Sequence, residues 1–186
     1  MSKVGVFLAD GFEEIEGLTV VDLLRRAGID TVTVSISNSR TVTGSHQIPV
    51  LADECIADTD FSTLDMLVLP GGMPGTTNLE KCEPLMKQVD AFHRAGKYIS
   101  AICAAPGVFG RAGILEGRDA TVYPGLEGEL KGAFPKTDPT VKSDHILTSR
   151  GMGTAIAFGL AIVERFKGKE AADQLAEKIV YFSDIR

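Results

Sequence analysis

The chain lacks the sequence patterns that mark nucleic-acid-binding, membrane and secreted proteins. No run of lysine or arginine forms a basic stripe, and 19 basic residues against 25 acidic ones give a formal charge of -6. We therefore expect no stable nucleic-acid partner. No apolar run approaches the ~20 residues that span a bilayer, so we expect no membrane segment. The N-terminal segment shows no cleavage site of a signal peptide, so we expect no leader.

Cysteine is scarce, and its spacing excludes the usual cysteine frameworks. The three cysteines, Cys55, Cys82 and Cys103, are widely spaced and form no CxxC pair. A disulfide framework or a structural zinc site is therefore not expected, and free thiols suit a reducing cytoplasm. The sequence also lacks a P-loop, a dinucleotide-binding glycine fingerprint and a metal-ligand cluster. We expect a cytoplasmic protein with no metal and no cofactor.

What the chain does have is an alternation of short apolar runs with amphipathic runs. This pattern is typical of a parallel sheet covered by helices on both faces. We predict one domain over residues 1–186 with a flavodoxin-like three-layer α/β/α fold and a mainly parallel sheet. The strands are expected at 4–8, 31–37, 66–69, 98–102 and 119–122, the hairpins at 41–50 and 140–148, and the helices at 14–27, 85–95, 105–112, 154–166 and 170–179.

Cys103 lies where a predicted buried strand turns into a predicted helix. Such a turn exposes a side chain at the carboxyl edge of the sheet, as in the nucleophile elbow of hydrolases, although the glycine-x-serine-x-glycine signature is absent. A helix N-terminus favours thiolate, so we expect a pKa below the usual value. The alternative is a small buried hydrophobic residue, which is what most free cysteines are.

Two further groups follow neighbouring strands. Gly71 and Gly72 follow the strand at 66–69, and the Gly72 amide together with that of Ala104 could form an oxyanion hole. The alternative is a flexible turn, but the position at a neighbouring strand end favours the site. Glu13, Glu14 and Glu16 follow the first strand, and favourable placement in a helix's first turn explains two of the three. A carboxyl turned toward the thiol would be desolvated, which raises its pKa and suits it to acid or base catalysis.

The apolar positions of the helix at 14–27 are expected to mark its buried side, with Glu16 lying between Ile15 and Leu18 in helical angle. Val21 and Leu24 continue this side. The helix at 154–166 is expected to begin at an N-cap formed by Gly153 or Thr154.

The three histidines have no clear role from position alone. His93 is expected to be solvated and His145 to lie at a hairpin tip, while His46, in a loop, could reach a site. None of them directly follows Cys103, so a local cysteine–histidine dyad is not visible.

Six segments together resemble the ThiJ/PfpI superfamily, in the branch that contains the Parkinsonism-associated deglycase (DJ-one) and its bacterial relatives. They run in order over nearly the whole chain, and jointly they are far more specific than any one of them. The segments are LADGFEEIE at 8–16, VDLLRRAG at 21–28, VLPGG at 68–72, AICAAP at 101–106, LTSRGMGT at 147–154 and AIVE at 161–164.

This resemblance implies a single domain of the class I glutamine amidotransferase-like type and a homodimer. It implies that Cys103 is the nucleophile, that Glu16 is its carboxylic partner, and that the oxyanion hole is formed by Gly72 and Ala104. Members of the superfamily are described as cofactor-free glyoxalases, deglycases, oxidative-stress sensors or chaperones. The residues that we place around the possible pocket are Gly71, Met73, Tyr123, His46 and Arg26.

Two departures from the superfamily pattern reduce the number of reactions that we expect at Cys103. Protease-like members carry histidine directly after the cysteine, where this chain has Ala104, so peptidase activity is disfavoured. Glyoxalase-type members often carry a His-Pro pair where this chain has Tyr123-Pro124, and a phenol does not replace imidazole's proton transfer near neutral pH. A cation from the partner subunit often lies near the site in the superfamily's dimer, and His46 corresponds to it here.

We therefore predict an enzyme that acts on a small carbonyl substrate, a reactive dicarbonyl or its adduct. A redox sensor whose cysteine oxidises to sulfinate, with little turnover, is the alternative. A binding or chaperone module with a structural Cys103 is the third reading. A peptidase or a thiazole monophosphate biosynthesis protein is less favoured.

Overall fold

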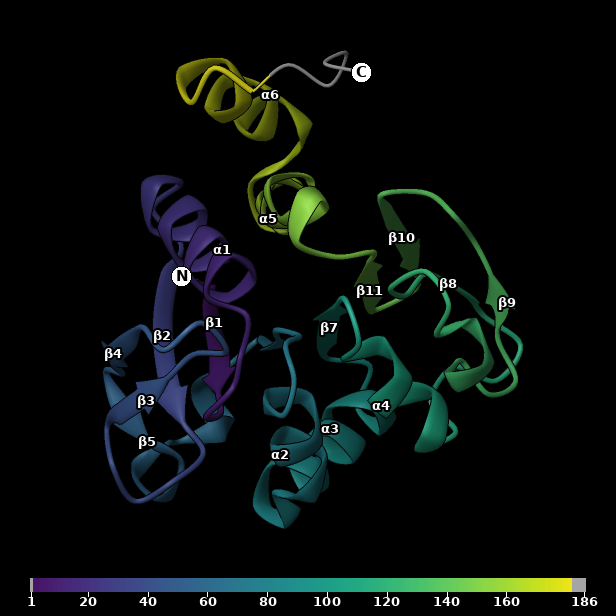
Figure 1. The fold of residues 1–186 in the computed structure, drawn as a ribbon. Helices are drawn as coiled ribbons and strands as arrows, with labels where there is room; N and C mark the ends of the chain where they lie inside the picture. The colour runs from purple at the N-terminus through teal and green to yellow at the C-terminus, as the bar shows by residue number, and fades with distance from the viewer. Residues whose placement is uncertain (1, 182–186) are drawn as a thin grey trace.

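The structure is a computed structural model, and it describes residues 2–181. A seven-stranded sheet in the order β10-β11-β7-β6-β1-β2-β5 forms its centre (Figure 1). All neighbouring strands pair in parallel except β10, which joins β11 as an antiparallel hairpin. The strands are β1 (Lys3–Leu8), β2 (Asp30–Ser35), β5 (Glu54–Cys55), β6 (Met66–Leu69), β7 (Tyr98–Ile102), β10 (Thr140–Ser143) and β11 (Ile146–Ser149).

Helices cover both faces of this sheet, which confirms the three-layer α/β/α prediction. In Figure 1, α1, α5 and α6 lie on one side of the strands, and α2, α3 and α4 lie on the other. The helices are α1 (Glu14–Arg26), α2 (Gly75–Lys81), α3 (Glu83–Arg94), α4 (Pro106–Arg111), α5 (Ala155–Lys167) and α6 (Lys169–Lys178). No helix within residues 2–181 is long and apolar enough to cross a membrane.

Two hydrophobic clusters join the layers, because side chains of a strand point alternately to its two faces. On β1, Val4 and Val6 belong to the cluster that includes Phe158 of α5, whereas Phe7 belongs to the cluster that includes Phe92 of α3. The β-strands at the centre therefore read as continuous apolar runs, as expected for strands buried on both faces.

Two small sheets lie outside the main one. The hairpin predicted at 41–50 forms from β3 (Thr41–Thr43) and β4 (Pro49–Leu51). The strand predicted at 119–122 is shorter, and it pairs in parallel with a segment that carried no strand signal, giving β8 (Asp119–Ala120) and β9 (Phe134–Pro135). β5 and α2 were not predicted, because both are short and neither carries a long periodic pattern.

The buried side of α1 agrees with the prediction at Val21 and Leu24 and differs from it at the start of the helix. Ile15 is 49% exposed and Leu18 is 38% exposed, whereas Glu14 and Glu16 are buried. The reason is Gly17, which faces the core because it has no side chain: a Cβ there would lie 3.0 Å from Phe12 and 3.3 Å from Leu8. Glycine does not count as an apolar residue in a periodic pattern. The apolar residues Ile15 and Leu18 were therefore assigned to the buried side instead of Gly17.

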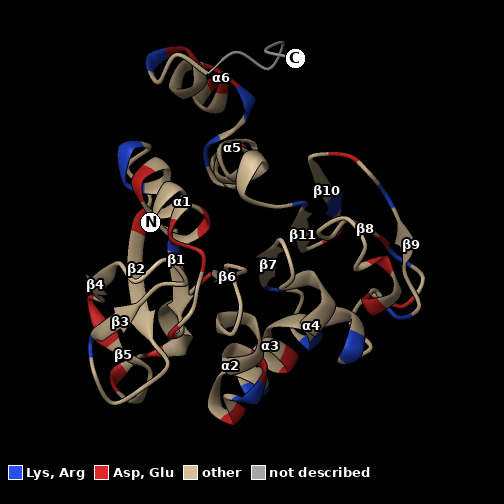
Figure 2. Ribbon diagram, viewed as in Figure 1, with Lys and Arg blue, Asp and Glu red and all other residues tan. Residues whose placement is uncertain are grey.

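Charge is spread over the chain as its composition suggests. Figure 2 shows Lys and Arg scattered among Asp and Glu along the described ribbon, without a continuous basic stripe. Several of these residues form ion pairs at helix surfaces, such as Arg94 with Asp90 and Lys169 with Asp173. Exposed pairs of this kind contribute little to stability, about 0–1 kcal/mol each.

Candidate functional site

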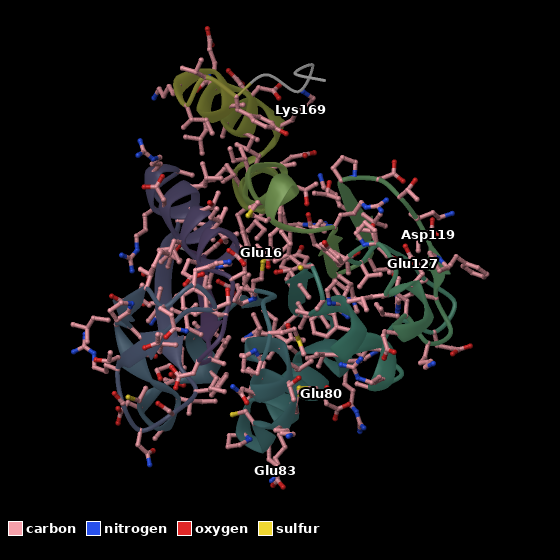
Figure 3. All side chains as sticks on the ribbon, in the orientation of Figure 1. Glu16, Glu80, Glu83, Asp119, Glu127 and Lys169 are labelled. Carbon is pink, nitrogen blue, oxygen red and sulfur yellow. The ribbon has the colours of Figure 1, made fainter. Side chains whose placement is uncertain are left out.

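Three turns meet at the carboxyl ends of β1, β6 and β7, where ligands bind in open α/β sheets. The segment after β1 is tied to the turn after β6, because the Glu13 N–H donates to the Gly71 carbonyl at 2.9 Å. The turn after β7 is tied to the end of β11, because the Cys103 N–H donates to the Ser149 carbonyl at 3.0 Å. Figure 3 labels Glu16 near the middle of the molecule, between α1 and these strand ends.

Cys103 occupies a left-handed backbone conformation with a φ of 63°. This region is uncommon for residues other than glycine and costs of order 1–3 kcal/mol, so it persists only where the surrounding structure enforces it. The strained turn presents the half-buried sulfur at the sheet edge, which confirms the elbow geometry. The helix that follows begins at Pro106 and has only 6 residues, which weakens the dipole argument used for the thiol.

Glu16 reaches this edge from the first turn of α1 and is 1% exposed. Its Oε2 atom accepts a hydrogen bond from the Gly71 N–H at 2.8 Å, while Oε1 has no partner among the described residues. Burial raises the pKa of this carboxyl to about 7, and hydrogen bonds from Cys103 and Gly71 offset only part of that effect. Near neutral pH the carboxyl is therefore divided between its protonated and ionised forms.

The thiol pKa moves in the direction opposite to our prediction. Burial raises the pKa of Cys103 to about 12, and the negative charge of Glu16 and its hydrogen bond to the thiol add to this, against the lowering by the Ala104 and Gly72 amides. The Glu16 contributions require an ionised carboxylate. Two acids this close share one proton, so thiolate forms when the proton lies on Glu16.

The two amides predicted as an oxyanion hole do face the sulfur. The backbone N–H groups of Gly72 and Ala104 both donate toward Cys103 and favour its anionic form. Gly72 has a φ of 90°, and a Cβ there would lie 2.3 Å from the Glu13 nitrogen. These donors are backbone groups held by the fold, so they are in place before any negative charge develops.

Gly71 allows the carboxyl and the thiol to meet. A Cβ at Gly71 would lie 2.5 Å from the Cys103 Cβ and 2.7 Å from Glu16 Oε2, distances that real Cβ atoms do not adopt. The residue was predicted as part of the pocket on the weak signal of a glycine pair. The structure gives it a specific reason: it is the space through which Glu16 reaches Cys103.

Tyr123 and Gly151 lie beside the sulfur. The Tyr123 N–H donates to the Cys103 carbonyl at 2.9 Å, and a Cβ at Gly151 would lie 3.3 Å from the Tyr123 ring and 4.0 Å from Sγ. Tyr123 was predicted as part of the pocket, whereas Gly151 was not. That loop is held by Thr154, the N-cap residue of α5, whose hydroxyl accepts from the Gly151 N–H at 3.1 Å.

Two residues predicted to line the pocket, Arg26 and Met73, do not lie beside Cys103 in the same way as Gly71. Arg26 lies ten residues after Glu16 on α1, about 15 Å along the helix, and pairs with Asp22 at 2.5 Å. It is therefore not part of the site. Met73 follows Gly72 directly and is largely exposed, at the rim of the turn after β6.

The histidines form their contacts with residues other than Cys103. The His46 Nδ1 is 3.2 Å from Glu14 Oε2, and its side chain is 69% exposed. The predicted solvated His93 is instead paired with His145, with Nδ1 and Nε2 3.0 Å apart. This pair joins α3 to the β10–β11 hairpin, residues far apart in sequence, so no local pattern could predict it.

The fold and the site define a class: an α/β protein with a half-buried cysteine on a strained strand-to-helix turn, a buried carboxyl beside it and two amide donors. The model of the DJ-1/PfpI family matches residues 2–165. The chain therefore belongs to the DJ-1/PfpI family.

Relatives of known sequence support this assignment. Protein DJ-1 homolog B of Arabidopsis thaliana is 38% identical over 180 residues, which cover 96% of this chain but 41% of that protein, so the chain spans less than half of it. Protein dj-1beta of Drosophila melanogaster is 34% identical, with 97% of this chain and 98% of that protein covered. The relative named glutathione-independent glyoxalase DJR-1.2, from Caenorhabditis elegans, is 31% identical, with 90% and 89% covered.

Solved structures agree. Oxidized Toxoplasma gondii DJ-1 superposes with a TM-score of 0.93 at 34% identity, covering 97% of this chain and 99% of that one. A cysteine-to-alanine variant of the DJ-1 superfamily protein STM1931 from Salmonella typhimurium has the same TM-score, 0.93, at 33% identity, with 98% and 100% covered.

Proposed function

We propose that the protein is an enzyme that converts small reactive dicarbonyls, such as methylglyoxal, to hydroxy acids without a cofactor, or hydrolyses their adducts. The observation that carries this proposal is the buried Glu16–Cys103 pair. It unites a nucleophile with a carboxyl whose pKa, about 7, suits it to carry protons in both directions. The name of the Caenorhabditis elegans relative as a glutathione-independent glyoxalase supports the same chemistry.

The first step is addition of the sulfur to the aldehyde carbon. The thiol proton passes to Glu16, and the thiolate forms a C–S bond while the carbonyl π pair moves to oxygen. The Gly72 and Ala104 amides, which donate toward the sulfur, stabilise the resulting oxyanion. Return of a proton to that oxygen gives a hemithioacetal.

The second step is proton transfer between adjacent carbons, followed by hydrolysis. Ionised Glu16 removes the proton from the carbon bonded to sulfur and returns it to the neighbouring carbon. A proton also moves from the hydroxyl oxygen on the first carbon to the ketone oxygen on the second, which converts the hemithioacetal to a 2-hydroxy thioester. Water then attacks the thioester, the C–S bond breaks, and Cys103 recovers its proton. The balance is one dicarbonyl plus one water giving one hydroxy acid, with no net oxidation.

Lactate formation from methylglyoxal tests this proposal. We expect lactate from the wild type, and a loss of activity in Cys103→Ala, because the nucleophile is absent. Glu16→Gln should retain the cysteine but lose proton transfer between the carbons, a step worth about 10²–10⁴-fold. Equal lactate traces for the three proteins would contradict the proposal.

A redox role is the second candidate, and it is favoured by the relative described as oxidized. Peroxide would oxidise the Cys103 sulfur to sulfenic acid and a second equivalent would give sulfinic acid, with water released at each step. The Gly72 and Ala104 amides and protonated Glu16 would donate to the sulfinate oxygens. Mass spectrometry after mild peroxide should show two added oxygens on Cys103 and none on Cys55 or Cys82; uniform oxidation of all three cysteines would reject this role.

We also propose a homodimer, as the resemblance to the superfamily implies. Apolar side chains are exposed on neighbouring surfaces of α1, the β3–β4 turn and the start of α5, and a second copy of this face would cover them. Leu18 and Ile156 line one groove, and the Ile48 N–H donates to Glu14 of α1 at 3.4 Å. Sedimentation should give a dimer for the wild type, whereas Leu18→Glu should shift it to monomer; a wild-type monomer at every concentration would contradict the proposal.

A further inference from the structure

A second group of ligating side chains lies outside the Cys103 site, where α1 begins beside the turn between β3 and β4. Glu13 Oε2, Glu14 Oε2 and His46 Nδ1 converge there, and these atoms all lie within 4.8 Å of one another. Within residues 2–181 this is the one group of three histidine, cysteine or acidic side chains arranged in this way. The sequence predicted no metal-ligand cluster because His46 is more than 30 residues from the two glutamates.

The distances match those around a tetrahedral metal ion. His46 Nδ1 lies 3.2 Å from Glu14 Oε2 and 3.6 Å from Glu13 Oε2. Ligands at ~2.0–2.1 Å from a tetrahedral zinc ion are about 3.3–3.4 Å from one another. The Ser45 hydroxyl is the fourth polar atom of the cluster, 3.3 Å from each carboxylate oxygen and 3.0 Å from the imidazole nitrogen.

The carboxylate of Glu14 is held in place by its other oxygen. Oε1 accepts hydrogen bonds from the His46 N–H at 2.8 Å and the Ile48 N–H at 3.4 Å, which leaves Oε2 directed at the imidazole. Gly44 permits this approach, because a Cβ there would lie 2.1 Å from Oε1. Backbone donors that orient a ligating carboxylate are the usual support of a metal site.

The negative charge of this cluster also favours binding of a cation. Two carboxylate oxygens face one imidazole, and among the described residues no lysine or arginine forms an ion pair with Glu13 or Glu14. His46 neutralises them only when it is protonated. Its side chain is 69% exposed in the single chain, on the turn that the second copy of the proposed dimer would cover.

We propose that Glu13, Glu14 and His46 bind one divalent first-row transition-metal ion, with Zn²⁺ as the best fit. One imidazole nitrogen and two carboxylate oxygens form a donor set that suits zinc. The Ser45 hydroxyl or a water molecule takes the fourth position. This site is separate from the Cys103 site and goes beyond the proposed function, which needs no metal.

Calorimetric titration with Zn²⁺ tests the proposal. The titrations use Cys103→Ala as the parent protein, so that the thiol cannot compete for the ion, and Co²⁺ serves as a visible spectroscopic probe of the same site. We expect one Zn²⁺ per chain. Adding His46→Gln or Glu13→Gln should weaken binding at least ~10-fold, because each removes one ligand atom. Zn²⁺ should raise the melting temperature of the parent but not that of the His46→Gln protein.

The matched control is His93→Gln, which removes an imidazole of the His93–His145 pair on α3 instead. It should leave the Zn²⁺ affinity unchanged. Three results overturn the proposal: no binding to the parent at millimolar Zn²⁺, the same affinity with and without His46, or a loss of binding in the His93→Gln protein alone.

Discussion

Glu14 and Glu16 lie two positions apart in the first turn of α1, and both are almost completely buried, at 4% and 1% exposure. Burial raises the pKa of both carboxyls, yet the net shifts have opposite directions. Backbone N–H donors, including those of His46 and Ile48, outweigh burial at Glu14 and lower its pKa. Glu16 has too few donors, so its pKa rises to about 7.

The comparison shows that hydrogen-bond donors, rather than depth, decide whether a buried carboxyl is ionised. Glu14 is satisfied by the β3–β4 turn and serves as a fixed negative charge. Glu16 keeps one oxygen without a partner and faces Cys103, so its proton is available for chemistry. Two carboxyls within one turn of α1 therefore differ in their protonation near neutral pH.

The largest expected effect is an opposite pH dependence of stability in Glu16→Gln and Glu14→Gln. The pKa of Glu16 is raised from 4.5 to about 7, so its favourable contribution is present below pH 4.5 and is lost as the pH rises through 7. Relative to the wild type, Glu16→Gln should gain about 3 kcal/mol of unfolding free energy between pH 4 and pH 8. Urea unfolding at several pH values measures this difference.

Glu14→Gln should behave in the reverse way. Its lowered pKa means that ionised Glu14 stabilises the wild type above pH 4.5, and that this stability is lost as the pH falls through the pKa of the folded state. The variant should therefore be less stable than the wild type near neutral pH and approach it in acid. The same pH dependence of stability in both variants would contradict the proposed difference between the Glu14 and Glu16 carboxyls.

The next effect compares two glycines. Gly71→Ala places a Cβ between Cys103 and Glu16, which should displace the carboxyl and reduce dicarbonyl turnover by about 10²-fold. Gly44→Ala places a Cβ against Glu14 Oε1 instead, so it should lower the melting temperature and leave turnover within a few-fold. Turnover and thermal melting of both variants provide the test, and equal turnover losses would show that the two regions are not independent.

A third effect concerns the thiol itself. The charge of Glu16 helps to raise the pKa of Cys103, so Glu16→Gln should lower that pKa by about one unit or more. Glu14→Gln should leave it unchanged. The rate of alkylation by iodoacetamide against pH reports the pKa, with alkylation located by mass spectrometry. A rise on Glu16→Gln would mean that the carboxyl holds the shared proton in the wild type.

The smallest effect is at Gly151, beside the Cys103 sulfur. Gly151 has an extended backbone, so alanine fits its conformation, but the new Cβ would lie 3.3 Å from the Tyr123 ring. Gly151→Ala should lower kcat/KM for phenylglyoxal a few-fold more than for methylglyoxal, because the larger substrate needs the space. Gly153→Ala, where a Cβ meets nothing within 4 Å, is the control.

Much of the fold was predictable because each central strand and long helix carries its own local pattern. Strands such as β1 and β6 read as apolar runs, and α3 and α5 were predicted within two residues of their observed ends. The prediction missed three elements, β5, α2 and β9. They are short, and their conformation depends on contacts with neighbouring elements rather than on a local sequence pattern. Ile15 and Leu18 were assigned to the wrong face of α1 because the pattern could not count Gly17 as a buried position.

The sequence by itself determined the order of strands and helices, the turn at Cys103 and the glycines beside it, since these depend on residues close together in the chain. Only the tertiary structure decided which glutamate meets the thiol and which meets His46. Those contacts join residues more than 30 positions apart, and their ionisation depends on the donors that each carboxyl finds there. That is why two neighbouring glutamates of one helix differ in the pKa of their side chains.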